Sequence, residues 1–301
     1  MSEVIFMPAS EDDDRLRHLA GSFLATYPNE NTRTGYAREI RRWFTWCQVR
    51  GVDPLTAHRT EVEVFMRELE PEYAVNTVCR ITGCLASWFK WLVHEEHIVT
   101  TPMLTIKRPS KDTSPKQIRL SRHDLMDMLT AAENRCHPGV WGLVSLLALN
   151  ALRVSEAVTP NIEDLAESHW HHTLAIWGKG DKPDVIPLHA RTMLAISAAT
   201  KGRTTGPLLL NEWGNRMSRA NARHAVRKVA DLAGLQNKRV TPHTFRHAAI
   251  TAALNAGVPM RDVQSFARHA DPKTTMHYDR NRDSFERHAT YNVAQYIAGS
   301  E

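Results

Sequence analysis

The stretch that says most about the fold lies at residues 241–247 and reads Thr241-Pro242-His243-Thr244-Phe245-Arg246-His247. If a helix starts at Thr241, His243 and Arg246 are three residues apart and share one face. An arginine fork matches two oxygens of a phosphate, and a histidine can transfer a proton near neutral pH. The stretch therefore predicts a helix that presents an imidazole and a guanidinium to one anionic ligand.

A second histidine and a tyrosine follow this stretch at a spacing of nine residues. Residues 269–278 read HADPKTTMHY, so that His269 opens the segment and Tyr278 closes it.

Upstream, a further arginine follows an apolar run. Residues 151–156 read ALRVSE, and Arg153 comes directly after the run from Val144 to Leu152. An arginine beside a core needs a partner, so either an ion pair with Glu156 or an anion site is implied. From this motif alone, the ion pair is the favoured interpretation.

A lysine lies in the one clear β element of the sequence. Two short apolar runs, 174–177 and 185–188, flank the glycine-rich segment GKGDKP at 178–183, which predicts a β-hairpin. Lys179 stands in its turn, and on its own it reads as a solvated turn lysine.

In order and spacing, these residues resemble the catalytic residues of the tyrosine recombinase or phage integrase family. That family has an arginine in a Leu-Arg-x-Ser-Glu context, a lysine in a Gly-Lys-Gly hairpin, His-x-x-Arg, a second histidine and a tyrosine nine residues later. The matching positions here are Arg153, Lys179, His243, Arg246, His269 and Tyr278. The resemblance implies that Tyr278 attacks a DNA phosphate, with the other five assembled around it.

Three positions depart from the family's usual pattern. Ala151 stands where a glycine usually precedes Leu-Arg, and Arg268 stands where a glycine usually precedes the second histidine. Asp184 takes the place of a basic residue that the hairpin often carries. None of the three removes a catalytic side chain.

The chemistry explains the residue types. A free tyrosine has a pKa near 10, so only about one in a thousand is ionised at pH 7. Two arginines can stabilise the phenolate and the charge that builds on the phosphate, without a metal or another cofactor. The resemblance implies that Lys179 protonates the leaving 5′-oxygen, that His243 handles the tyrosine proton and that His269 holds a phosphate oxygen.

The expected fold is mainly α with a small β-hairpin, an α+β catalytic domain preceded by a helical bundle. The predicted boundaries are an N-terminal core-DNA-binding domain at 1–105, a proline-containing linker at 106–118 and a catalytic domain with a tail helix at 119–301. Two N-terminal aromatic stripes recur at helical spacing, which favours a core over a base-stacking platform. They comprise Tyr36, Ile40, Trp43, Phe44 and Cys47, and then Ile81, Leu85, Trp88, Phe89 and Leu92. Ser121 and Asp124 predict a capping box at the start of the second domain.

Charge is distributed unevenly and points to a polyanion as the partner, which the resemblance implies to be double-stranded DNA. The chain has a formal net charge of +5, but residues 1–110 hold 13 basic and 15 acidic side chains, against 25 and 18 in 111–301. Four arginines recur at three- and four-residue steps, so on a helix they would form a basic, DNA-facing stripe. They are Arg216, Arg219, Arg223 and Arg227.

Other classes of function find little support. The four cysteines lack disulfide or zinc spacing, and neither a signal peptide nor a membrane-spanning run is present, so we expect a cytoplasmic, DNA-associated protein. The cluster His169-Trp170-His171-His172 lacks metal-site spacing and reads as a loop before a strand. We expect no membrane, small-molecule or metal partner.

The C-terminal segment predicts a short amphipathic helix behind Ser284. Its apolar positions are Phe285, Ala289, Val293, Ala294 and Ile297. Such a helix must bury its apolar face, either in its own domain or, as the resemblance implies, on a neighbouring protomer of a tetramer assembled on two DNA sites.

The expected function is site-specific DNA recombination through a 3′-phosphotyrosine intermediate, for DNA integration, excision or dimer resolution. Two alternatives remain at this stage. One is a DNA-relaxing enzyme similar to type IB topoisomerases, and the other is a DNA-binding protein without catalytic activity.

Overall fold

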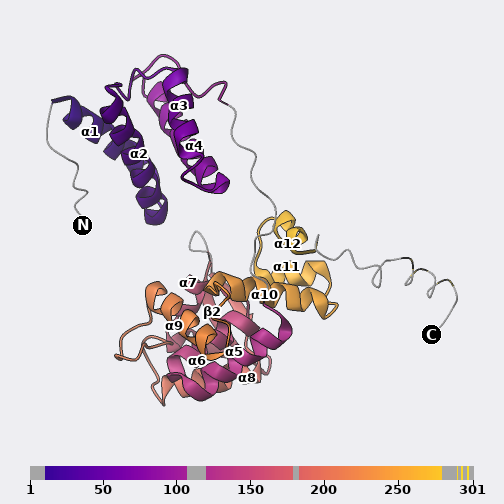
Figure 1. Ribbon diagram of the computed structural model, residues 1–301. Coiled ribbons are helices and arrows are strands. Elements are labelled where there is room, and N and C mark those ends of the chain that lie inside the picture. Colours follow the sequence, from indigo (N-terminus) through magenta and orange to yellow (C-terminus); the bar gives the residue numbers. More distant parts are fainter. Residues whose placement is uncertain are drawn as a thin grey trace. The chain divides into compact units, whose positions relative to one another are not determined.

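The chain divides into two compact units, residues 1–115 and 116–301 (Figure 1). The structure, a computed structural model, describes residues 11–106, 120–178 and 183–279 and the single positions 290, 293 and 297. Side chains are described over 14–106, 120–178 and 183–276 and at those three positions. Of the predicted linker, only Ile106 belongs to the described residues.

The first unit is helical. Its described helices are α1 (Glu11–Ala25), α2 (Glu30–Arg50), α3 (Arg59–Leu69) and α4 (Val75–His94). Gly51 ends α2 in the left-handed conformation with φ 63°, which a glycine adopts without steric cost.

Both aromatic stripes form the core of this unit, as predicted. Ile40, Trp43 and Cys47 of α2 are buried, and all five apolar residues of the second stripe are buried on α4. Tyr36 and Phe44 are partly buried and pack against the same core. Helical spacing therefore identified the buried faces correctly, and neither stripe is a stacking platform.

The second unit has a larger apolar core, to which most of its helices contribute. Its elements before the sheet are α5 (Arg122–Arg135), α6 (Pro138–Leu149), α7 (Val154–Val158) and the 3₁₀ turn η1 (Ile162–Asp164). After the sheet come α8 (Ala190–Thr200), α9 (Arg219–Leu232), α10 (Pro242–Asn255), α11 (Met260–Ala267) and α12 (Pro272–Asp279). Ser121 and Asp124 form the predicted capping box at the start of α5.

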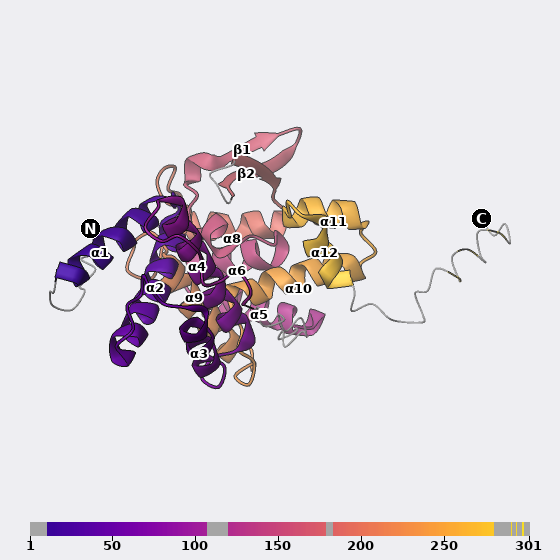
Figure 2. The ribbon, with the colours of Figure 1, turned by 90° about the horizontal axis from the view of Figure 1, so that it is seen from above.

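A small antiparallel sheet lies at the edge of the second unit (Figure 2). Its strands are β1 (Leu165–Ser168), β2 (His171–Trp177) and β3 (Pro183–Pro187) in the order β1-β2-β3. The pair β2–β3 confirms the predicted hairpin, with Leu174 opposite Ile186. Strand β1 was not predicted, and residues 179–182 lie outside the described part of the chain.

Helices α10, α11 and α12 pack together at one end of this unit, where the colours turn from orange to yellow (Figure 2). A separate apolar cluster holds α10 and α11 to the segment before α7. Its buried members are Ala151, Ala249, Ile250, Leu254, Val263 and Ala267. The cluster matters for function because Arg153, Arg246 and His269 each lie two or three residues from one of its members.

These elements confirm the predicted fold class, a mainly helical chain with a small sheet. The four cysteines are free thiols. Among the described residues, no helix combines the length and the apolar character needed to cross a membrane.

Candidate active site

Arg153 lies at the N-terminal boundary of α7, and Glu156 fixes it there. The Glu156 side chain accepts the backbone N–H of Arg153 through Oε2 (2.8 Å) and the Arg153 guanidinium through Oε1 (2.5 Å). The Arg153 side chain remains 38% exposed, whereas that of Glu156 is 1% exposed. The ion pair anticipated from the sequence is thus real, and it still leaves Arg153 partly open to a ligand.

Arg246 is the more deeply buried arginine, at 2% exposure on α10. Its Nη1 donates to the Ala151 carbonyl at 2.6 Å, and its Nη2 donates to the Ala267 carbonyl. Ala151 adopts φ 48°, so the backbone turns sharply just before Arg153. Arg246 therefore joins the segment before α7 to the end of α11.

His243 lies one turn before Arg246 on α10, which begins at Pro242 behind the N-cap Thr241. Its Nε2 lies 2.7 Å from Nε2 of His247, and the two rings meet edge to face. Burial lowers the pKa of His243, and the charges of Arg246 and Arg153 lower it further. His243 is therefore neutral at pH 7 and able to accept a proton.

His269 lies in the connection between α11 and α12, and it is buried. Its Nδ1 is 2.9 Å from the hydroxyl oxygen of Thr275, a buried residue of α12. Burial and, to a lesser extent, the charges of Arg246, Arg153, Arg268 and His243 together lower the pKa of His269 to about 4. The imidazole is thus neutral at pH 7 and held in one orientation by α12.

Tyr278 belongs to the same helix as Thr275, three residues further on, although its side chain is outside the described residues. The bond between Thr275 and His269 therefore ties the helix that carries Tyr278 to His269. Lys179 also lies outside the described residues, between β2 and β3.

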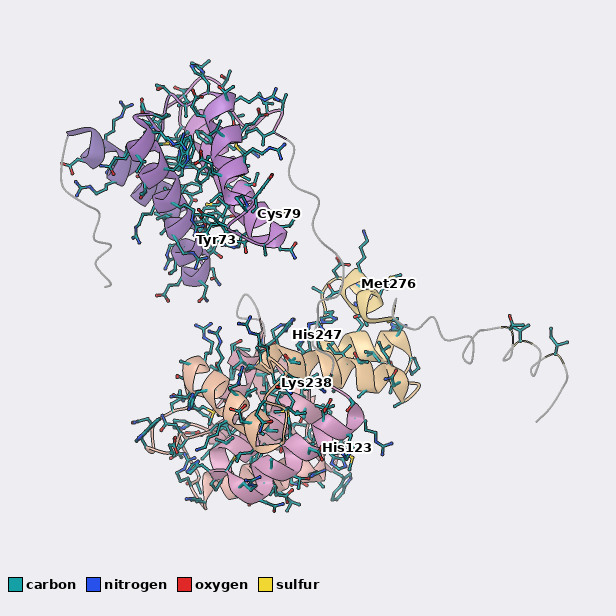
Figure 3. The ribbon with its side chains drawn as sticks, viewed as in Figure 1. Tyr73, Cys79, His123, Lys238, His247 and Met276 are labelled. Atoms are coloured by element: carbon teal, nitrogen blue, oxygen red, sulfur yellow. The ribbon has the colours of Figure 1, made fainter. Side chains whose placement is uncertain are left out.

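Four of the six predicted residues thus come together from three separate segments. Arg153 precedes α7, His243 and Arg246 belong to α10, and His269 follows α11. Figure 3 labels His247 on α10 and Met276 on α12, the helices on which this group depends. The group combines two cations with two neutral imidazoles, which can bind a phosphate and accept or donate a proton.

Three contacts of this group were not predicted from the sequence. His247 lies four residues after His243 in the opening stretch, and Thr275 is one of the paired threonines before Tyr278, so helical spacing offered a signal for both. Arg268 bonds to the Ala151 carbonyl (3.1 Å) and to Glu156 (3.2 Å). Those partners are more than a hundred residues away in sequence, and no local pattern could have shown them.

Helix α9 contains three of the four arginines of the predicted basic stripe. That helix begins at Arg219 behind the N-cap Ser218, so Arg216 is not part of it. The Arg216 guanidinium bonds instead to residues 158–161, at the end of α7 and just after it, with Nη1 2.6 Å from the Thr159 carbonyl. Arg219 and Arg223 are exposed on α9, and Arg227 is exposed beside Asp231 at 3.7 Å.

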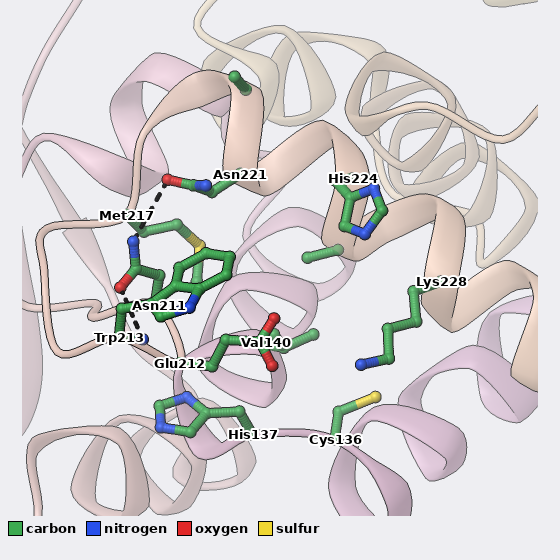
Figure 4. Close-up of a pocket in the computed structure, with 12 residues that line it drawn as sticks. Cys136, His137, Val140, Asn211, Glu212, Trp213, Met217, Asn221, His224 and Lys228 are labelled. Atoms are coloured by element: carbon green, nitrogen blue, oxygen red, sulfur yellow. Dashed lines mark hydrogen bonds between the residues drawn. The ribbon is translucent and has the colours of Figure 1, made fainter.

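A cavity of about 320 Å³ lies elsewhere in the second unit, against a different face of α9 (Figure 4). Cys136, His137, Trp213, His224 and Lys228 are among the residues that line it. Arg153, His243, Arg246 and His269 do not, so the cavity is separate from the candidate active site.

Comparison with known proteins identifies the family of the chain. The model of the phage integrase family matches residues 119–284, more than half of the chain. The chain belongs to the phage integrase family. The match covers every position that the sequence motifs singled out, from Arg153 to Tyr278.

A tyrosine recombinase XerD of Listeria monocytogenes serotype 4b (strain F2365) is 28% identical over 264 residues, covering 82% of this chain and 87% of that protein. A lambda integrase dimer bound to a COC′ core site has a TM-score of 0.71 at 15% identity, covering 90% of this chain and 78% of that one. XerH bound to its difH substrate, in a pre-cleavage complex, has a TM-score of 0.67 at 17% identity, covering 82% and 76%.

The two solved structures show that the family's fold is shared. The family and its curated relatives confirm the expected class of enzyme, a tyrosine recombinase, which cleaves and rejoins DNA strands.

Proposed function

We propose that this protein is a site-specific DNA recombinase in which Tyr278 forms a 3′-phosphotyrosine intermediate. The observation that supports this most is the convergence of Arg153, His243, Arg246 and His269. Burial and hydrogen bonds hold them in one place, and α12, the helix of Tyr278, is bonded to the group through Thr275 and His269.

In the cleavage step, the Tyr278 oxygen attacks phosphorus and the bond to the 5′-oxygen breaks. Arg153 and Arg246 neutralise the charge that develops on the non-bridging oxygens. His243, whose pKa is lowered, accepts the phenol proton, and His269 contacts a phosphate oxygen as a neutral ring. Lys179 protonates the leaving 5′-oxygen.

The new phosphotyrosine bond conserves the energy of the phosphodiester. A 5′-hydroxyl from a partner duplex can therefore attack it and regenerate the phenol, without a nucleotide cofactor. We expect this exchange within a tetramer on two double-stranded DNA sites, for integration, excision or dimer resolution.

The described tail residues support an assembled state. Val293 and Ile297 are helical, but they are 52% and 76% exposed in the single chain. Apolar residues at helical spacing that are exposed in one protomer are suited to dock on another. The rest of the predicted tail helix lies outside the described residues.

Trapping of covalent complexes followed by sequencing of the attached DNA tests the proposal. The protein is expressed in cells, complexes are captured under denaturing conditions, and recovered sites are rebuilt as synthetic duplexes. A recombinase joins two cognate duplexes and attaches at one defined sequence. Relaxation of any plasmid at scattered sites would indicate a type IB topoisomerase, and failure to form any adduct would indicate a DNA-binding protein.

A further inference from the structure

Arg268 adopts a backbone conformation that disfavours its own side chain. It ends α11 at φ 52°, in the left-handed region, directly before His269. A glycine adopts this conformation without steric cost, whereas an arginine does not. Lys201 ends α8 at φ 50° in the same way, but its side chain is exposed.

Unlike Lys201, the Arg268 side chain is turned inward, with 13% of it exposed. Nη1 donates to the Phe266 carbonyl at 2.9 Å. Nη2 donates to the Ala151 carbonyl at 3.1 Å and to Glu156 Oε2 at 3.2 Å. The guanidinium therefore contacts the carbonyl that anchors Arg246 and the carboxylate that anchors Arg153.

Glu156 consequently has two cations as partners. Arg153 bonds to Oε1 and Arg268 to Oε2, and the carboxylate itself is buried. If Arg153 were the only partner, its movement toward a DNA phosphate would leave a buried carboxylate without a cation. Such an uncompensated buried charge is strongly unfavourable. With Arg268 present, Glu156 keeps a cation when Arg153 turns away.

We propose that Arg268 is a positioning residue that neutralises the buried carboxylate of Glu156 and so allows Arg153 to turn toward the DNA phosphate. This inference rests on the proposed function, because it concerns how the same site engages its substrate. Arg268 acts through Glu156 and Arg153 and does not itself contact the phosphate.

The electrostatics of the cluster agree with this role. Burial lowers the pKa of the Arg268 guanidinium, whereas Glu156, and more weakly Asp184 of β3, raise it. Of the other two positions that depart from the family pattern, Ala151 accepts a hydrogen bond from Arg268, whereas Asp184 acts on Arg268 only weakly, through its charge.

The test compares single-turnover cleavage of a suicide duplex that carries a site recovered by covalent trapping. The variants are Arg268→Gly, Arg268→Met, Arg268→Lys and the double variant Arg268→Gly with Glu156→Gln. Lys201→Gly is the matched control, because it makes the same backbone change at an exposed helix end. Non-covalent binding of the uncleaved duplex is measured in parallel.

We expect Arg268→Gly and Arg268→Met to slow cleavage by at least about tenfold. The loss of a hydrogen bond to a charged group usually costs more free energy than a tenfold change in rate corresponds to. Arg268→Lys should keep most of the rate, Lys201→Gly should match the wild type, and DNA binding should change little. Adding Glu156→Gln to Arg268→Gly should restore most of the lost rate, because the neutral amide no longer holds Arg153.

Two results would overturn the inference. A wild-type rate in Arg268→Met would mean that apolar bulk suffices, and absence of rescue in the double variant would mean that Arg268 contacts the phosphate directly. Thermal unfolding of Glu156→Gln, Arg268→Met and their combination separates this from a failure of the proposed function. If the two single variants and their combination lose stability non-additively but the wild type forms no DNA adduct, recombination is rejected and the Glu156–Arg268 ion pair is confirmed. If the wild type forms adducts but the Arg268 variants cleave at the wild-type rate, only the inference is rejected.

Discussion

At the scale of single residues, the two arginines of the site differ in how far folding depends on them. Arg153 is partly exposed, whereas Arg246 is buried and bonded to two backbone carbonyls. We expect Arg153→Ala and Arg246→Ala each to slow cleavage about a hundredfold, the usual loss for one donor to a transition-state oxyanion.

Stability should distinguish the two substitutions. Arg246→Ala removes the donors to Ala151 and Ala267, so we expect a clearly lower unfolding temperature, whereas Arg153→Ala should unfold closer to the wild type. Thermal unfolding of both variants provides the measurement. An Arg246→Ala protein as stable as the wild type would show that the buried bonds do not support the fold.

His269 should make stability depend on pH. Its folded-state pKa is about 4, below the 6.5 of a free histidine. The unfolded chain therefore takes up this proton first, and stability that is present above pH 6.5 is lost as pH falls toward 4. The loss attributable to His269 is on the order of 3 kcal/mol, and the lowered pKa of His243 acts in the same direction.

The substitution His269→Asn removes the titration while keeping a polar partner for Thr275. Urea unfolding from pH 7 to pH 4 should show a flatter pH dependence in this variant than in the wild type. Equal slopes in the two proteins would mean that His269 titrates normally.

The residue types of the site and its local ion pair, Arg153 with Glu156, could be predicted from the sequence, but the contacts between distant segments could not. The ALRVSE motif left an ion pair and an anion site as alternatives for Arg153, and the structure shows the ion pair on a side chain that is still partly exposed. Arg268 appeared only as an unusual residue before His269. Its link to Glu156 depends on how α7 and α11 pack, which no local pattern encodes.

At the scale of elements, periodicity predicted the buried helices well because each buries one continuous apolar face. Strand β1 escaped prediction because its residues 166–168 are exposed and only Leu165 is partly buried, so that no apolar alternation marks it. The predicted stripe placed Arg216 on a helix that begins only at Arg219, since the Ser218 cap fixes the start.

Helix α9 should contact phosphates through its exposed arginines. We expect the double variant Arg219→Gln, Arg223→Gln to weaken binding to all DNA sequences alike and to reduce the salt slope by about two units, one per lost contact. Arg216→Gln is the matched control, because its guanidinium bonds to its own loop. It should lower the unfolding temperature and leave the salt slope unchanged.

Binding isotherms at several salt concentrations decide this point. A loss confined to the cognate site, with an unaltered salt slope, would mean that Arg219 and Arg223 read sequence and that the phosphate assignment is wrong.

At the scale of the whole molecule, the tail after Tyr278 is expected to couple assembly to catalysis. Truncation after Asp283 removes the exposed Val293 and Ile297 together with the rest of the predicted tail helix. We expect the shortened protein to stay folded and bind single sites, but to lose cooperative assembly and recombination. Unfolding temperature, gel shifts and strand-exchange assays measure these three properties.

A truncated protein that is insoluble or unfolds far below the wild type would contradict docking in trans. In that case the tail helix would belong to the core of its own domain, and its exposed residues would need another explanation.

The central claim is that Tyr278 becomes covalently joined to DNA, and peptide mapping of the trapped adduct tests it most directly. Wild type and Tyr278→Phe are incubated with a suicide duplex in the presence of EDTA, and the attached peptide is identified by mass spectrometry. The account predicts a phosphotyrosine peptide at Tyr278 in the wild type, and no adduct but nearly normal DNA binding in Tyr278→Phe. An adduct that persists in the variant, for instance at Tyr291 or Tyr296, or one that requires a metal ion, would contradict it.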